Sequence, residues 1–541
     1  MMVGANPPPN PNSNFTPAER KPIMNYRVFS ENEWVYPDSE LTAPNAAELH
    51  APRGADTCFQ VLTDCSLQGG EAVTFDFGLP GCEAVVYRLL SATVPLNSHA
   101  KVLCTEDYES VKHFVTRKAP FDVYDITCPP EEAEGEAGRA AFYVRINVGR
   151  DAPVGLHEGD LTLRIGGEVV VIPLSLRIYN VRVPTLEESA FHMVNWIYYD
   201  RLARDHRAEI ASDAYMDILD RYLDNQLDMR NDHLMIPSGV PLRDEAGRVV
   251  DFDFSNAEAV GNRALERGFK YVMGGFVARF KVWDDPDHTL LWDRDVTVTS
   301  IEGYRQLKLY FTRAYECIHR NGWEARYMQC LVDEPQFPNS LTYRALAGIC
   351  RKCIPGVTIN DPVESSQLAG ACDIWVVKQA IFEKYIEDYK QLQACGETMW
   401  IYTCGFPGGY CMNRVLDLPL VASRLPMWMC YKYGAPGFLH WGYHVHNPEG
   451  RRDTNYHTDG VSYPAGNAHV VYPTETGVWN GVRGHLQRAG AIDYELLHLL
   501  GQRDRDKALA IIERVCRTFD DYDFSAKALD AARRELLEAL G

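Results

Sequence analysis

The sequence predicts a multidomain protein: an N-terminal β-sandwich, then a (β/α)8 barrel of the TIM type with a C-terminal helical extension. Three observations predict this architecture. Short apolar runs separated by Gly, Pro and Asp recur through residues 25–184, a pattern typical of a sandwich. From residue 185 onward, eight strand-like runs alternate with longer segments of helical spacing, as in such a barrel. The last residues are strongly helical and contain no strand-like run.

The domain boundaries follow changes in composition. A chain of 541 residues is too long for one ordinary domain. We expect a disordered lead-in over residues 1–24, which are rich in Pro and Asn, then the sandwich over 25–184, the barrel over 185–500 and the extension over 501–541. The lead-in has no apolar segment like that of a secretory signal. Fifteen cysteines in scattered apolar contexts are typical of reduced thiols, so we expect a cytoplasmic protein.

The individual elements follow from spacing. The sandwich strands are expected at residues 58–62, 72–77, 84–90, 141–148, 161–165 and 169–178. The barrel strands are expected at residues 191–196, 230–236, 269–274, 327–332, 357–360, 374–378, 399–402 and 437–441. Helical spacing occupies residues 214–225, 304–318 and 343–354. Residues 485–540 are expected to form the closing barrel helix and an appended helical pair.

Charge excludes some classes of partner. The formal net charge is −20, which repels nucleic acids and anionic lipids. No run approaches about 18 uncharged apolar residues, so we expect no membrane span. A small neutral or cationic substrate suits this charge.

Two adjacent acids form the most informative motif. Asp333 and Glu334 end the apolar run 327–332, and Pro335 should stop the strand there. Pro335 is also expected to bias Glu334 towards extended backbone angles. Acids at the mouth of a strand suit acetal hydrolysis, in which one group delivers a proton and another stabilises positive charge. The alternative is a structural Asp-Glu-Pro that caps a turn.

The barrel favours the catalytic interpretation, because its active sites lie where the strands end. A sugar ring stacks its C–H faces on aromatic rings, and its hydroxyls need fixed polar partners. We therefore expect substrate-binding residues at the other strand ends, although the two tryptophans could belong to the core and the histidine could be structural. These candidates are Asn195, Trp196, His233, Lys378, Gln379, Tyr402, Trp441 and Tyr443.

We expect no metal and no cofactor. His440, His444 and His446 have no supporting carboxylate at ligand spacing. The sequence does not predict an oligomeric state.

Four sequence motifs resemble glycoside hydrolase family 123, over roughly residues 25–500. They are Leu331-Val332-Asp333-Glu334-Pro335, Trp400-Ile401-Tyr402, the run from Gly437 to Tyr443 (GFLHWGY), and Arg483-x4-Arg488-x-Gly490-Ala491-x-Asp493-Tyr494-Glu495. The resemblance implies an exo-acting, retaining N-acetyl-β-galactosaminidase that uses the acetamido group of its own substrate as nucleophile. It implies that Glu334 is the general acid/base and that Asp333 orients the acetamido group and stabilises the oxazolinium ion. Tyr402 is expected to bond the acetamido oxygen.

A small glycan or glycoconjugate is therefore the expected substrate, and two alternatives stay open. One is a conventional two-carboxylate glycosidase, with Asp361 or Glu475 as nucleophile, acting on a sugar without an acetamido group. The other is a carbohydrate-binding protein without catalysis.

Overall fold

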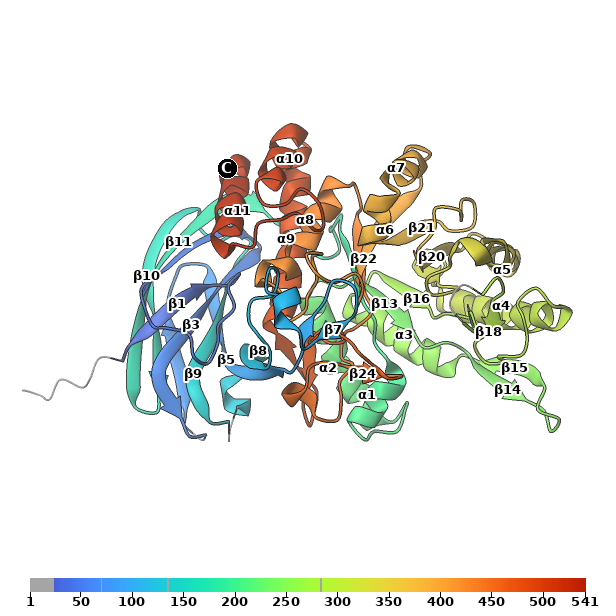
Figure 1. Cartoon of the computed structure of the whole chain (residues 1–541), viewed down its shortest axis with the longest axis horizontal. Helices are drawn as coiled ribbons and strands as arrows, with labels where there is room; N and C mark the ends of the chain where they lie inside the picture. The colour runs from blue at the N-terminus through green and yellow to red at the C-terminus, as the bar shows by residue number, and fades with distance from the viewer. Residues whose placement is uncertain (1–23, 70, 134–135, 283–284) are drawn as a thin grey trace, which may run out of the picture.

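The computed structural model describes residues 24–69, 71–133, 136–282 and 285–541 (Figure 1). Of the expected lead-in, residues 1–23 lie outside the described residues. Figure 1 shows the N-terminal sheets at one end of an elongated molecule and the barrel at the other. Helix α11, at the C-terminus, packs against strands β2 and β11 of the N-terminal sheets.

Two N-terminal sheets share one apolar core. In the described residues, one has the strand order β1-β3-β9-β5-β8-β27-β26 and the other β2-β11-β10-β4. Leu161, Leu163 and Ile165 alternate along β10 and belong to the same buried cluster as Val144 and Ile146 of β9. The strands are β1 Tyr26–Ser30, β2 Ala47–Arg53, β3 Ala55–Leu67, β4 Val73–Phe77, β5 Cys82–Val94, β8 Phe121–Cys128, β9 Gly138–Val148, β10 Gly155–Ile165, β11 Glu168–Arg182, β26 Val471–Pro473 and β27 Val478–Gly481.

Eight parallel strands of the described chain form a barrel of the TIM type, as the sequence predicts. Their order is β12-β23-β22-β21-β20-β19-β16-β13, and the Asp232 N–H donates to the Met193 carbonyl at 3.2 Å between the first and last strands. They are β12 His192–Asn195, β13 His233–Ile236, β16 Tyr271–Gly274, β19 Tyr327–Gln329, β20 Thr358–Val363, β21 Ile374–Lys378, β22 Thr398–Thr403 and β23 Gly437–His440.

Side chains alternate between the two faces of each barrel strand. Val194, Met273, Val376 and Leu439 belong to the buried cluster inside the barrel. Neighbours such as Met193 and Phe438 instead join the core between the strands and the surrounding helices. This alternation decides which residues at the strand ends face the barrel mouth.

Most of the helices cover the barrel with their apolar faces, whereas α11 packs on the N-terminal sheets. Helix α4 begins where the Ser300 hydroxyl accepts the Gly303 N–H, and it buries Leu307, Tyr310 and Phe311 at helical spacing. The helices are α1 Tyr199–Asp205, α2 Asp213–Asp228, α3 Ser255–Arg267, α4 Ile301–Asn321, α5 Ser340–Cys353, α6 Gln379–Lys384, α7 Ile386–Ala394, α8 Leu425–Lys432, α9 Val482–Gly501, α10 Arg505–Glu513 and α11 Ala526–Leu540.

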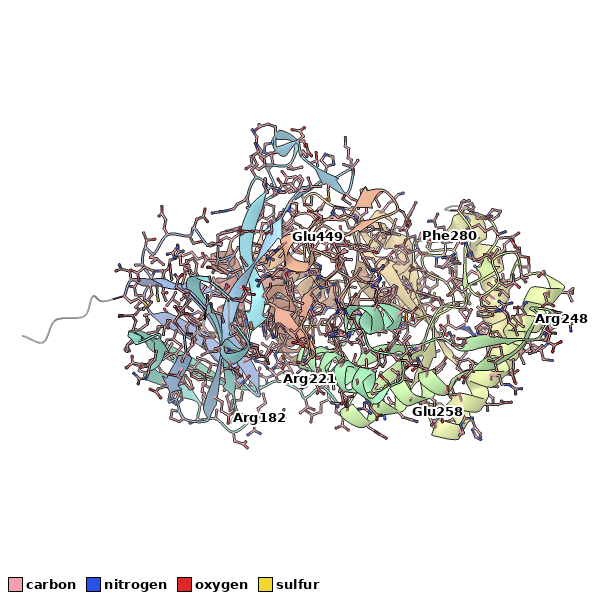
Figure 2. The ribbon with its side chains drawn as sticks, turned by 90° about the horizontal axis from the view of Figure 1, so that it is seen from below. Arg182, Arg221, Arg248, Glu258, Phe280 and Glu449 are labelled. Carbon is pink, nitrogen blue, oxygen red and sulfur yellow. The ribbon has the colours of Figure 1, made fainter. Side chains whose placement is uncertain are left out.

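The remaining elements are short strands and 3-10 turns in the segments that connect the larger ones. Figure 2 shows Arg248, between β14 and β15, at the end of the molecule far from Arg182 of β11. These elements are β6 Asn97–Ser98, β7 Cys104–Thr105, β14 Val240–Arg243, β15 Val249–Asp253, β17 Ala278–Arg279, β18 Thr289–Leu290, β24 His457–Thr458 and β25 Val461–Ser462, with the 3-10 turns η1 Tyr108–Ser110, η2 Pro130–Glu132, η3 Phe337–Asn339, η4 Leu420–Ser423 and η5 Gly450–Arg452. In the described residues no helix is both long and apolar enough to cross a bilayer.

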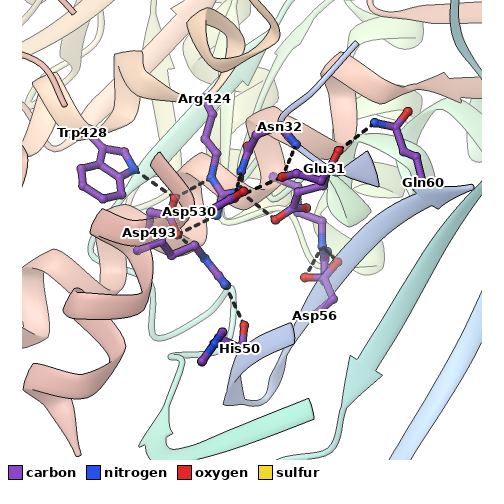
Figure 3. A network of polar contacts seen from close by, with 12 residues as sticks. Glu31, Asn32, His50, Asp56, Gln60, Arg424, Trp428, Asp493 and Asp530 are labelled. Atoms are coloured by element: carbon purple, nitrogen blue, oxygen red, sulfur yellow. Dashed lines mark hydrogen bonds and ion pairs between the residues drawn. The ribbon is translucent and has the colours of Figure 1, made fainter. Parts of the chain in front are cut away.

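Buried ion pairs join helix α9 to the N-terminal sheets. Arg424 donates to both Asp493 oxygens at 2.6 and 3.0 Å and to Glu31 at 2.8 Å (Figure 3). Burial raises the pKa of Asp493, but the charges of Arg424 and Arg533 outweigh it and hold this pKa below its usual value. Asp493 belongs to the last of the four motifs, so that motif holds the two parts of the molecule together.

Candidate active site

The acid pair follows β19 in a segment fixed by neighbouring strands. The Leu331 N–H donates to Asp361 Oδ1 at 2.7 Å, and the Glu334 N–H donates to the Pro362 carbonyl at 3.1 Å. Glu334 has a φ of +51°, so the expected extended backbone is wrong: the residue is in the left-handed region. A glutamate holds this unfavourable conformation only because its neighbours impose it, which is common at functional sites.

Two donors hold the Glu334 carboxylate. The Tyr402 hydroxyl donates to Oε1, and Lys378 Nζ lies 3.0 Å from the same oxygen. Lys378 also pairs with Glu364, so one ammonium serves two carboxylates. Burial lowers the pKa of Lys378, but the neighbouring Cys404, Glu334 and Glu364 outweigh it and raise this pKa. Lys378 therefore stays charged.

Asp333 stands beside this group in a different environment. Asp333 is an exposed residue, so small molecules can reach it, yet enough protein surrounds its carboxyl group to desolvate it. Burial raises the pKa of Asp333 strongly, and the charges of Glu334 and Glu364 add to the rise against the opposing effect of Lys378. Asp333 therefore favours its neutral form more than an ordinary aspartate does.

Aromatic residues flank the acids. The rings of Trp441 and Tyr463 meet edge to face with centroids 5.5 Å apart, and Tyr456 lies 6.1 Å from Tyr463. The Arg201 guanidinium donates to the Tyr456 hydroxyl at 2.5 Å. Burial raises the pKa of Tyr198, and the negative charge of Asp333 raises it further, which places this phenol near the acid pair. We call Tyr198, Trp441, Tyr456 and Tyr463 the aromatic wall.

Sequence reasoning missed three members of this wall, together with Glu364 and Arg201. Tyr456 and Tyr463 belong to the long loop after β23, around the β24–β25 hairpin. Tyr198 and Arg201 follow β12, and Glu364 follows β20 directly. The position of Glu364 one residue past a strand end was the one usable signal, because the loop residues have no periodicity.

The structure places the remaining predicted residues in several environments. Trp196 faces the barrel interior against Phe276, with ring centroids 5.4 Å apart. Asn195 faces outward, where it accepts from Arg414 and donates to Asn231. Tyr443 is buried and donates to Asn225 Oδ1 of α2 at 2.8 Å. Gln379 is buried at the start of α6.

His233 lies at the opposite, N-terminal end of its strand. Asp232 lies between two histidines there, with His192 Nδ1 and His233 Nδ1 each 2.7 Å from one of its oxygens. These three residues are close enough to hold a metal ion. Lys270 Nζ is 3.8 Å from the same carboxylate, however, and this positive charge opposes a second cation.

The two other candidate nucleophiles are engaged elsewhere. Asp361 is fully buried, and its second oxygen accepts from the Tyr343 hydroxyl at 2.6 Å. Burial raises the pKa of Asp361. Glu475 lies between β26 and β27, which extend the N-terminal sheet.

Comparisons with known proteins identify a family and a similar fold. A model of the glycoside hydrolase 123 catalytic domain matches residues 196–500. A family 123 glycoside hydrolase from Clostridium perfringens, studied for glycolipid glycan hydrolysis, has a similar structure with a TM-score of 0.73 and 11% identity, covering 96% of this chain and 97% of that one. An endo-beta-1,4-mannanase from Thermotoga petrophila has a TM-score of 0.36 and 12% identity, covering 58% of this chain and 78% of that one. No curated protein sequence matches the chain.

Proposed function

Because the chain belongs to glycoside hydrolase family 123 and is a glycoside hydrolase, we propose that it removes terminal N-acetyl-β-hexosamine from a glycan or glycoconjugate. β-N-acetylgalactosamine is the favoured sugar, and the substrate's acetamido group is the nucleophile. The adjacent Asp333 and Glu334 carry this proposal.

In the first step Glu334 protonates the glycosidic oxygen. The acetamido carbonyl oxygen attacks the anomeric carbon as the bond to the aglycone breaks, and a cyclic oxazolinium ion forms. Asp333 accepts the acetamido N–H and stabilises the developing positive charge. Water then attacks the anomeric carbon while Glu334 takes its proton, so the product keeps the β configuration.

The position of the carboxylates supports a nucleophile supplied by the substrate. A conventional retaining enzyme needs a second carboxylate about 5 to 5.5 Å from the acid, across the sugar ring. Adjacent residues cannot lie on opposite faces of one ring. Both oxygens of Asp361 accept hydrogen bonds, and Glu475 lies in the hairpin of the N-terminal sheet.

The aromatic wall supports the sugar-binding part of the proposal. Trp441, with Tyr456 and Tyr463, offers ring faces beside the acids, and Trp196 is directed to the same side from β12. Lys378 and Tyr402 contact the Glu334 carboxylate and contribute by positioning it. Asn195, His233, Gln379 and Tyr443 are proposed to support the strands and loops that bear these groups.

Two further parts of the chain flank the barrel: the N-terminal sheets and the last two helices. We propose that the N-terminal sheets form a β-sandwich domain and that α10 and α11 form a C-terminal extension. The sandwich then spans residues 25–184 with β26 and β27 added, and the barrel spans residues 185–500.

A panel of chromogenic glycosides tests the mechanism. The wild type should cleave the β-N-acetylgalactosaminide and leave the β-galactoside intact, because the latter has no acetamido group. Asp333→Asn and Glu334→Gln should each lose orders of magnitude in kcat/KM. A thiazoline mimic of the oxazolinium ion should inhibit the enzyme. Cleavage of the β-galactoside by Asp333→Asn would refute substrate assistance.

A further inference from the structure

The buried guanidinium of Arg414 has no carboxylate partner. Its Nη1 donates to two neutral amide oxygens, Asn195 Oδ1 at 2.6 Å and Gln487 Oε1 at 3.1 Å. Its Nε and Nη2 have no protein acceptor within the described residues, although Arg414 is only 2% exposed. Three N–H bonds of a buried cation therefore lack a protein acceptor.

His440 offers another donor on the same side of the sheet. Asn195 and His440 are register partners on the parallel strands β12 and β23, so their side chains lie on the same face. His440 Nδ1 accepts the Gly442 N–H at 3.0 Å, which leaves the ring proton on Nε2. This Nε2 is buried and, within the described residues, has no protein partner.

Asn467 and His469 come from an adjacent segment. Arg483 Nη1 donates to the carbonyls of both Arg414 and Gly466, at 2.7 and 2.6 Å, so the two segments lie side by side. The amide atoms of Asn467 are also buried without partners among the described residues. The His469 ring is buried beside them and close to the Val445 backbone. We call Arg414, His440, Asn467 and His469 the Arg414 cluster.

The charges around the Arg414 cluster do not cancel. Arg483 is compensated by Asp125, whose Oδ2 lies 2.8 Å from Nη2. Burial lowers the pKa of His440, and the charges of Arg414 and Arg483 lower it further. Burial also lowers the pKa of His469, with added effects of His446 and of the two arginines, so both rings are neutral. Burial and the charge of Arg483 lower the pKa of Arg414, against the opposing effect of Asp125. A guanidinium is basic enough to stay protonated in a protein, so Arg414 is left as a buried positive charge without a carboxylate in contact. Such a charge is costly unless it is paired.

We propose that the Arg414 cluster binds one small monovalent inorganic anion of the chloride type, which accepts from the free N–H groups of Arg414 and His440. An anion supplies both the missing negative charge and the missing acceptors, whereas water supplies only the acceptors. The site lies on the outer face of β12, where Asn195 contacts Arg414, and Trp196 is on the opposite, inner face. It is independent of the proposed sugar chemistry.

Bromide, an anion similar to chloride that scatters X-rays anomalously, can locate the site in the wild-type protein. Crystals of the wild type grown or soaked in sodium bromide should show an anomalous difference peak within contact distance of Arg414 Nη2 or Nε. Arg414→Gln should show no such peak, and Arg517→Gln, at an exposed pair with Asp521, should keep it. A bromide peak confined to the molecular surface would overturn the proposal.

Thermal unfolding gives a second readout. The midpoint of the wild type should rise by about 2 °C or more with chloride, relative to gluconate at equal ionic strength. Arg414→Gln should lose this difference, and Arg517→Gln should keep it. Equal midpoints in the two salts for the wild type would also count against an anion.

Discussion

The Tyr402 hydroxyl donates a hydrogen bond to Glu334 Oε1, the oxygen that also lies 3.0 Å from Lys378 Nζ. The two donors come from adjacent strands, β22 and β21, so this carboxylate oxygen has a fixed position. A phenol has one proton and cannot donate to Glu334 and to an acetamido oxygen at the same time. With its proton donated to Glu334, Tyr402 positions the acid.

Tyr402→Phe should lower kcat by about 10- to 100-fold and leave KM within about twofold, because the lost bond orients the proton donor. The loss should be larger for a poor leaving group than for an activated aryl glycoside, which needs less proton transfer. Steady-state kinetics with the two substrates measure both effects, with Tyr389→Phe, buried on α7, as the control. A higher KM with unchanged kcat would show instead that Tyr402 binds the acetamido group.

The pH profile should depend on Asp333. Its pKa is raised by burial and by Glu334 and Glu364, and the neutral acid lacks the negative charge that stabilises the oxazolinium ion. Activity should therefore fall as the pH falls through this raised pKa. Glu364→Gln removes one negative neighbour, so the acid limb of kcat/KM should move to lower pH, while Glu387→Gln on α7 should leave it in place.

A displacement of the acid limb to higher pH would contradict this electrostatic relationship. Complete loss of turnover in Glu364→Gln, with wild-type sugar binding, would indicate that Glu364 takes part in the chemistry directly.

The raised pKa of Asp333 also predicts a stability cost. The folded state holds the proton more tightly than the unfolded state, where an aspartate titrates near pH 3.9. Below that pH Asp333 is protonated in both states and does not lower the free energy of unfolding. As the pH rises above it, the unfolded state gains relative stability. Asp333→Asn should therefore unfold at a higher temperature than the wild type near pH 8, and this gain should disappear near pH 3.5. An equal gain at both pH values would rule out this explanation.

Much of the barrel was predictable because most of its strands are apolar runs and most are followed by a helix of regular spacing, although the described residues between β20 and β21 form no helix. Strand alternation explains why part of the site was not. Asn195 and Trp196 are consecutive and face opposite sides, so only Trp196 is directed to the mouth. Tyr443 would face inward if β23 continued, but the strand ends at His440. At Gly442 a Cβ would meet the backbone of Ala468. The chain turns there and carries Tyr443 to α2.

The missed features depend on contacts between distant segments. Strands β26 and β27 join the N-terminal sheet through a pairing of Asn480 and Gly481 with β8, some 350 residues earlier in the chain. The loop with Tyr456 and Tyr463 is held in the same way: the Leu96 N–H donates to Asn455 Oδ1, and Asn455 Nδ2 donates to the Tyr463 carbonyl. Local periodicity carries no information about such pairings.

The stability of the whole molecule should depend on Arg424. It is fully buried and bonds Asp493 of α9 and Glu31, which follows β1. Arg424→Met should lower the free energy of unfolding by about 3 to 5 kcal/mol, because it leaves these two buried carboxylates without their main counter-charge. Urea denaturation at neutral pH measures this loss. Arg514→Gln, which breaks an exposed pair with Glu535, should change the unfolding midpoint little. A loss in Arg424→Met as small as that of Arg514→Gln would show that the network in Figure 3 does not hold the N-terminal sheets to the barrel.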